Sequence, residues 1–271
     1  MGLRINTNIS ALNASRVLRR STLDLNKTLE QLSSGLRINR AADDAAGLAI
    51  AEGFRSQVLG TGVAQRNVQD GISLVQTAEG ALSETTNILQ RMRELAVQAA
   101  NGTQSGDNRL AIQSEINQLA EQITSIAKDT EFNGVAVLNT TSAIVIQAGI
   151  YSGQTLALSM ASATAAALGV SNLSVVSMTL AASAISVIDT ALKTVNTVRA
   201  NLGAYQNRLE FTMNTLGIQQ ENASSAESAI RDADIAQVTI RFTRNQILVN
   251  AGTSILAQAN VVPQTALQLL R

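Results

Sequence analysis

The 271-residue chain contains no histidine, no cysteine and no tryptophan, and it has a single proline. Without histidine it lacks the side chain that most often serves as a base at neutral pH and as a metal ligand. Without cysteine it has no thiolate nucleophile, no disulfide and no zinc-ribbon ligands, so the composition does not distinguish between redox compartments. The composition therefore predicts no catalytic, metal-binding or cofactor-binding residues, and a protein that is not an enzyme.

Charge is also scarce. Lys and Arg balance Asp and Glu at 20 each, and charged residues make up 15% of the chain, against roughly 25% in soluble domains. Nucleic-acid binding needs a basic stripe, which a neutral chain without blocks of like charge does not offer. No uninterrupted apolar run approaches the roughly 20 residues of a membrane span, and the first residues lack the apolar stretch of a signal peptide. We expect neither nucleic-acid binding nor membrane insertion, and no general-secretion signal.

A seven-residue repeat is the strongest pattern. In the C-terminal half an apolar residue recurs at every seventh position from Ile188 to Ile230. Sustained heptads predict a long helix that buries one stripe against other helices. About 45 residues at 1.5 Å each give a rod of roughly 65–70 Å. A second run, from Val68 to Ala96, stops before Asn101-Gly102, which we interpret as a C-cap.

A third helix follows, with Asp107 as the predicted N-cap and apolar residues on one face between 112 and 126. Together the three runs predict a mainly α fold, an elongated bundle of antiparallel helices.

The middle of the chain differs from the heptad runs. Residues 131–134 indicate a turn. The apolar segments 144–146 and 155–158 flank a glycine-containing stretch and predict a small β-hairpin. Residues 161–184 are rich in Ala, Ser and Thr, and we expect them to be irregular or weakly helical. The segment 35–65 holds five glycines and is predicted to be less regular than its neighbours.

The two ends resemble each other, since both carry apolar stripes with few charges. An isolated helix of this kind is marginal in water, because its stability comes mainly from packing. We therefore expect the ends to pair with each other and with neighbouring copies. The predicted packing residues are Leu18, Leu25, Leu29, Leu32, Ile247, Ala251, Ile255, Leu256 and Val262.

Several other features have a plainer interpretation that we favour. Asp43-Asp44 lacks a partner base and fits a polar connection or an inter-subunit contact better than catalysis. The C-terminal stretch has three Arg and one Phe, which favours partner helices over lipid. Arg91 and Leu95 are one turn apart and indicate either a solvated helix face or a compact binding patch.

Seven stretches of the chain match the sequences of one known family closely: residues 1–14, 32–50, 89–98, 132–135, 202–209, 251–260 and 269–271. On these stretches the chain closely resembles bacterial flagellin, the subunit of the flagellar filament. The resemblance covers about residues 1–140 and 185–271.

The resemblance implies a minimal flagellin, because the middle is too short for outer globular domains. It implies terminal helices that form an inner coiled-coil tube in the polymer, from residues 1–40 and 235–271. Residues 41–234 would then form a helical rod with a β-hairpin near 140–160. The metalloprotease insert of some flagellins is excluded, since the chain has no histidine.

The resemblance also implies a secreted, extracellular homopolymer of the bacterial flagellum that serves motility. Its implied partners are an export chaperone of the flagellar type III system, and the filament cap and junction proteins. By motif match, Arg91, Leu95 and Glu115 fall on the positions at which many flagellins contact a host Toll-like receptor. The alternative is a hook–filament junction protein, which shares the terminal helices but forms a short ring.

Overall fold

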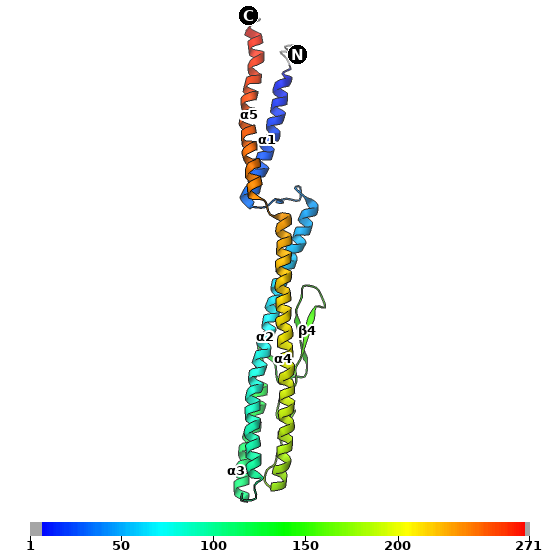
Figure 1. The fold of residues 1–271 in the computed structure, drawn as a ribbon, viewed down its shortest axis with the longest axis vertical. Coiled ribbons are helices and arrows are strands. Elements are labelled where there is room, and N and C mark those ends of the chain that lie inside the picture. The colour runs from blue at the N-terminus through cyan, green and yellow to red at the C-terminus, as the bar shows by residue number, and fades with distance from the viewer. Residues whose placement is uncertain (1–6, 269–271) are drawn as a thin grey trace. The chain divides into compact units, whose positions relative to one another are not determined.

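The computed structural model describes the backbone of residues 7–268 and the side chains of residues 7–261. The chain divides into two compact units. The terminal unit comprises Met1–Val58 and Asn222–Arg271, and the rod unit comprises Leu59–Glu221. The helices and strands (Figure 1) are α1 (Ile9–Ser34), α2 (Ala45–Ala99), α3 (Gly106–Asp129), β1 (Glu131–Phe132), β2 (Val135–Ala136), β3 (Ala143–Gln147), β4 (Thr155–Ser159), α4 (Met178–Arg231) and α5 (Ile235–Gln268). The mainly α fold predicted from the heptads is confirmed.

The rod unit holds the hydrophobic core, which α2, α3 and α4 build together. The predicted heptad seam of α2, from Val68 through Leu82 to Ala96, is 0% exposed at every seventh residue. The α4 seam is buried in the same way from Ile188 to Leu216. A Cβ on Gly62 would lie near Gln220 and a Cβ on Gly71 near Leu209, so the two helices run antiparallel. The heptad pattern therefore predicted the core of the bundle correctly.

Among the described helices, α4 alone is long and apolar enough to cross a membrane, judged by length and composition only. The buried residues of its apolar first half recur at intervals of three and four, which is the spacing of a bundle seam. They are Ala181, Ala184, Ile188, Ala191 and Val195.

The two helix caps predicted between α2 and α3 differ from those in the structure. Helix α2 ends at Ala99, two residues before the predicted Asn101-Gly102 stop. Helix α3 is capped by Ser105, whose side chain accepts a hydrogen bond from the Asn108 N–H at 3.2 Å. The prediction of Asp107 as the N-cap is wrong, because Asp107 already lies in the first helical turn.

Two short antiparallel hairpins follow α3. Strands β1 and β2 pair across a tight turn in which Asn133 and Gly134 have φ of +49° and +76°. Strands β3 and β4 pair in register from Ala143↔Ser159 to Gln147↔Thr155, which confirms the predicted hairpin. The irregular stretch ends at Ser177, where the prediction had extended it to residue 184.

The β3–β4 hairpin docks on α2. The Asn67 side chain donates a hydrogen bond to the Gln147 carbonyl at 3.1 Å. A Cβ on Gly71 would lie 2.3 Å from Ile146 Cδ1, and a Cβ on Gly60 would lie 2.9 Å from Ile150 Cγ2. The glycines of α2 therefore let the hairpin approach the helix backbone.

The prediction that residues 35–65 are less regular is wrong from Ala45 onward, where α2 is continuously helical. Gly60 is used for contact with the hairpin, as described above. At Gly47 a Cβ would lie closest to the Asp44 carboxylate and 2.9 Å from Ile38 Cδ1. Glycine costs about 1 kcal/mol in a helix interior, and close packing at these positions accounts for its presence.

Candidate assembly interface

The terminal unit contains an antiparallel pair of helices, α1 and α5 (Figure 1). Asn8 caps α1, because its Oδ1 accepts a hydrogen bond from the Ala11 N–H at 3.0 Å. The Asn8 amide also donates to the Ala259 carbonyl at 2.8 Å and so ties the start of α1 to the C-terminal half of α5. At the other end of α1, Gly35 adopts the left-handed conformation (φ +71°) that ends many helices. Its carbonyl accepts from the Ala233 N–H at 2.9 Å, just before α5 begins.

The facing stripes of the two helices recur at intervals of three and four residues. On α1, leucines alternate with the small or polar residues Ser21 and Thr28. On α5, Gly252 lies over Leu18, whose Cδ1 would be 3.1 Å from a Cβ at that position. Of the α5 stripe, Val238 is buried and Leu256 is partly buried.

The pair has almost no apolar interior of its own. The buried residues of α1 are Ser21, Thr28 and Gln31, all polar. On α5, Val238 is the buried apolar residue among those whose side chains are described. The hydrophobic core cluster, by contrast, consists of rod-unit residues. Within the described residues, the α1–α5 pair therefore buries few apolar side chains completely.

A second apolar stripe on α5 is exposed and lies outside the stripe that faces α1. Ile240, Ile247, Leu248 and Ile255 are 46–61% exposed. The first three of these line a shallow apolar groove with Thr239, Thr243 and Arg244. Exposed apolar residues gathered on one helix face mark an interaction surface. We call these four residues the outward stripe.

The structure divides the predicted packing residues between the two faces. Leu18, Leu25, Leu32 and Leu256 are partly buried on the facing stripes. Leu29, Ile247, Ala251 and Ile255 are exposed. The side chain of Val262 lies outside the described residues.

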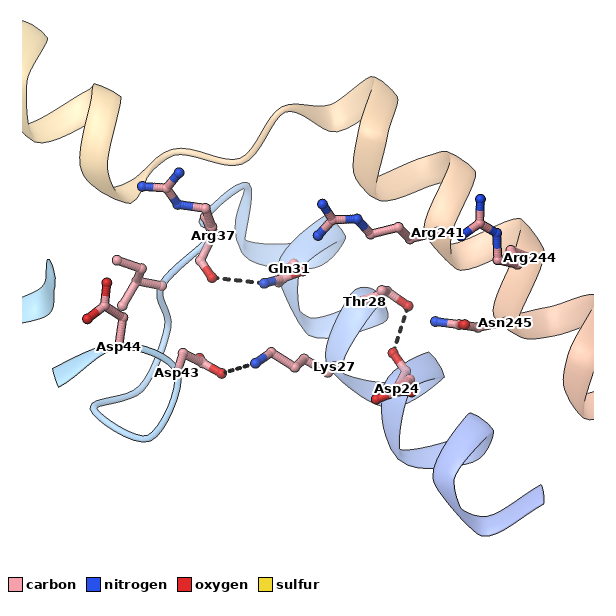
Figure 2. Close-up of a pocket in the computed structure, with 11 residues that line it drawn as sticks. Asp24, Lys27, Thr28, Gln31, Arg37, Asp43, Asp44, Arg241, Arg244 and Asn245 are labelled. Atoms are coloured by element: carbon pink, nitrogen blue, oxygen red, sulfur yellow. Dashed lines mark hydrogen bonds and ion pairs between the residues drawn. The ribbon is translucent and has the colours of Figure 1, made fainter. Parts of the chain in front are cut away.

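A polar pocket lies between α1, the segment that follows it, and the first turns of α5 (Figure 2). Lys27 and Asp43 form an ion pair across it, with Nζ and Oδ1 2.7 Å apart. This hydrogen bond from Lys27 lowers the pKa of the Asp43 carboxyl and outweighs the opposing effect of burial, and the backbone N–H groups of Arg40 and Asn39 lower the pKa further. The pocket therefore fixes the loop after α1 onto α1 itself.

Asp44 lies beside Asp43 and has a different role. Its Oδ1 accepts a hydrogen bond from the Gly47 N–H at 2.9 Å and so caps the start of α2. The two carboxylates are thus engaged separately, which agrees with the interpretation of Asp43-Asp44 as a polar connection. Among the residues described, no group of three or more acidic side chains is placed to hold a metal ion.

The same loop is tied to the end of α4. The Arg37 N–H donates to the Arg231 carbonyl at 2.7 Å, and the Arg37 guanidinium donates to the carbonyls of Ala229 and Ile230. These carbonyls have no partner within the helix, so Arg37 acts as a C-cap supplied from outside. Sequence reasoning missed this role because nothing near Arg37 in the chain points to residue 230.

Residues 5–143 match the model of the bacterial flagellin N-terminal helical region, and residues 185–270 match that of the C-terminal helical region. These two segments contain α1, α5 and most of the helices of the rod unit. The chain belongs to the bacterial flagellin family.

Similar proteins include the flagellar filament 33 kDa core protein of Treponema phagedenis, 46% identical over 98% of this flagellin and 99% of that protein. The crystal structure of Bacillus cereus flagellin covers 56% of the chain and 88% of its own, with a TM-score of 0.51 at 37% identity. A putative flagellar hook-associated protein of Vibrio parahaemolyticus matches with a TM-score of 0.59 over 70% of the chain and 100% of its own. Its identity is 13%, so that likeness is one of fold and does not favour the junction-protein alternative.

The flagellin rod unit carries the three residues predicted to contact a receptor. Arg91 is exposed and forms ion pairs with Glu115 of α3 at 3.0 Å and with Glu94 at 3.2 Å. Leu95 is 2% exposed and belongs to the bundle core. The structure therefore brings Arg91 and Glu115 together at the surface and leaves Leu95 beneath it.

Proposed function

We propose that this flagellin is a structural subunit of the bacterial flagellar filament that polymerises through α1 and α5. The observation that carries the proposal is the outward stripe of α5, together with the lack of an apolar interior in the α1–α5 pair. The flagellar filament core proteins among its relatives support the same function.

Covering the exposed apolar side chains of α1 and α5 would favour association between copies. Covering a side chain that is about half exposed removes about half of its area from water, roughly 1 kcal/mol for Ile or Leu. The four residues of the outward stripe then contribute about 4 kcal/mol per subunit. Ile9, Leu12 and Leu23 of α1, which are 54–64% exposed, add to this. Each subunit contacts several neighbours in a helical polymer, so such contributions recur at every added copy.

In the assembled filament, residues 1–40 and 235–271 form an inner coiled-coil tube and residues 41–234 a rod layer around it. The exposed termini of an unassembled copy need protection until assembly, which fits an export chaperone, and a cap and a junction protein would bound the polymer. We place the assembled protein outside the cell, as a propeller for motility.

Two adjacent residues test the interface. Ile255 belongs to the outward stripe and is 57% exposed, whereas its neighbour Leu256 is partly buried on the face toward α1. In Ile255→Asp the unassembled chain should keep its helicity, because the new carboxylate stays in water. In the polymer the carboxylate would be buried unpaired, at a cost of several kcal/mol.

We expect the critical concentration for polymerisation of Ile255→Asp to rise by about a hundredfold or more, since 1.4 kcal/mol is tenfold. Leu256→Asp should also lower the helicity of the unassembled chain, and Ile255→Val is the matched control that should polymerise normally. Circular dichroism and electron microscopy of negatively stained samples provide the two measurements. Normal filaments from Ile255→Asp would contradict the role of the outward stripe.

The receptor contact is a second proposal, supported by the exposed Arg91–Glu115 pair. A receptor with a complementary polar surface would contact these two side chains, while Leu95 supports α2 from within the bundle. Arg91→Ala should weaken Toll-like receptor signalling by the purified monomer without changing its melting temperature. Undiminished signalling would contradict this proposal and leave the filament function untouched.

A further inference from the structure

Two Asn-Gly pairs lie on the surface of the rod unit, and they differ in geometry. Asn101-Gly102 lies in the connection between α2 and α3, and Asn133-Gly134 forms the turn between β1 and β2. All four residues are exposed. Asn-Gly is the dipeptide in which the following backbone nitrogen is least shielded, because glycine has no side chain. In both pairs that nitrogen is free to attack the asparagine side-chain carbonyl.

At Asn101 a hydrogen bond to the backbone holds the side chain. Its Oδ1 accepts a hydrogen bond from the Thr103 N–H at 3.2 Å, which forms an Asx turn. This bond folds the side-chain amide over the intervening Gly102 peptide and draws electron density from the carbonyl carbon. Among the described residues, the Gly102 N–H has no hydrogen-bond acceptor to hold it back.

At Asn133 the side chain is not held in this way. The asparagine is fixed in the left-handed conformation, with φ of +49°, by the strand pairs on either side of the turn. Within the described structure no hydrogen bond holds the Asn133 side-chain amide toward the Gly134 nitrogen. The two pairs therefore share their chemistry and differ in preorganisation.

We propose that Asn101 is a site of spontaneous deamidation in the folded protein. The Gly102 nitrogen loses its proton to solvent and bonds to Cγ of Asn101, and the side-chain nitrogen leaves as ammonia. The product is a cyclic succinimide. One water molecule then opens the ring at either carbonyl, which gives aspartate or isoaspartate at position 101. No oxidant, reductant or cofactor takes part.

The modification acts on a junction that holds the rod unit together. The Arg109 guanidinium of α3 donates to the carbonyls of Ala99 at 2.9 Å and of Asn101 at 3.0 Å. Isoaspartate inserts a methylene group into the backbone at residue 101 and moves the second carbonyl away from Arg109. Either product also adds a negative charge at the C-terminal end of α2, where the helix dipole disfavours it.

The test compares the two Asn-Gly pairs within one chain. The full-length protein is incubated at mildly alkaline pH, folded or in urea, and its tryptic peptides are analysed by liquid chromatography and mass spectrometry. The peptide Glu94–Arg109 contains Asn101 and also Asn108, which serves as an internal control because arginine follows it. In the folded protein we expect Asn101 to deamidate several-fold faster than Asn133, with isoaspartate among the products. In urea the two rates should become similar.

A matched variant checks that the glycine nitrogen is the nucleophile. Gly102→Ala adds a methyl group where no atom lies within 4 Å and where φ is not positive, so the loop should keep its structure. It should slow deamidation at Asn101 and leave Asn133 unchanged. Equal rates at Asn101 and Asn133 in the folded protein, or an undiminished rate in Gly102→Ala, would overturn the proposal.

Discussion

Two glycines of one helix should respond to the same substitution with opposite signs. Gly71 and Gly80 both lie in the part of α2 that belongs to the rod unit. A Cβ on Gly80 would meet nothing within 4 Å, whereas a Cβ on Gly71 would lie 2.3 Å from Ile146 Cδ1. Carbon atoms in contact are normally 3.5–4.0 Å apart, so Ile146 would have to move by more than about 1 Å.

The magnitudes follow from two competing effects. Alanine stabilises a helix interior by about 1 kcal/mol relative to glycine, which is the whole effect expected for Gly80→Ala. At Gly71 the overpacking of a buried side chain costs about 1–3 kcal/mol, and Ile146 is 9% exposed. We expect Gly71→Ala to destabilise the rod unit by up to about 2 kcal/mol.

A double-mutant cycle assigns the effect to one contact. Ile146→Val removes the Cδ1 atom and alone should cost about 0.5–1.5 kcal/mol. Combined with Gly71→Ala it should cost less than the sum of the two single changes, because the clash is gone. The measurement is urea unfolding of the unassembled chain followed by circular dichroism. Additive effects, or stabilisation by Gly71→Ala alone, would refute the close approach of the hairpin to α2.

Three further results are expected. Asp43→Asn removes the ion pair with Lys27. Because the pKa of Asp43 is lowered in the folded state, the variant should be less stable than the parent above pH about 4, and this difference should vanish as pH falls further. A difference that grows in acid would contradict the role of the ion pair. Arg109→Ala removes two charge-assisted hydrogen bonds to the α2 end and should lower the free energy of unfolding by about 1–3 kcal/mol. The terminal unit holds twelve Lys and Arg side chains against eight Asp and Glu, so gathering many copies concentrates positive charge. Added salt, or Arg16→Gln with Arg20→Gln, should therefore speed polymerisation, and slower assembly would argue that these charges pair between subunits.

The heptads predicted the bundle core because apolar residues that recur every seven positions in the sequence form one buried stripe on a helix. The glycines led to the wrong prediction for residues 35–65, because helix propensity depends on the local sequence whereas packing depends on contacts with distant residues. Gly47 leaves room for Asp44 and Ile38. Gly60 leaves room for Ile150, which lies ninety residues further along the chain. A penalty of about 1 kcal/mol per glycine is easily outweighed by such contacts.

The faces of α5 were not predictable in the same way. This helix carries apolar residues on both sides, so the sequence marks Ile255 and Leu256 alike. What separates them is the position of α1, fixed by Asn8 at one end and by Leu18 under Gly252 further along. The polar pocket escaped prediction for a related reason, since it brings together three segments distant in sequence, 24–31, 37–44 and 241–245.

The distribution of burial sets the order in which the parts of this flagellin become stable. The largest fully buried side chains, from Val68 to Leu209, all belong to the rod unit. That unit therefore has the core to fold by itself, whereas the α1–α5 pair buries polar Ser21 and Thr28 and exposes its isoleucines. Changes in the rod unit should alter the unfolding of the unassembled chain, while changes on the outward stripe should alter the critical concentration alone. In the proposed polymer, neighbouring copies would supply the apolar contacts that the α1–α5 pair lacks.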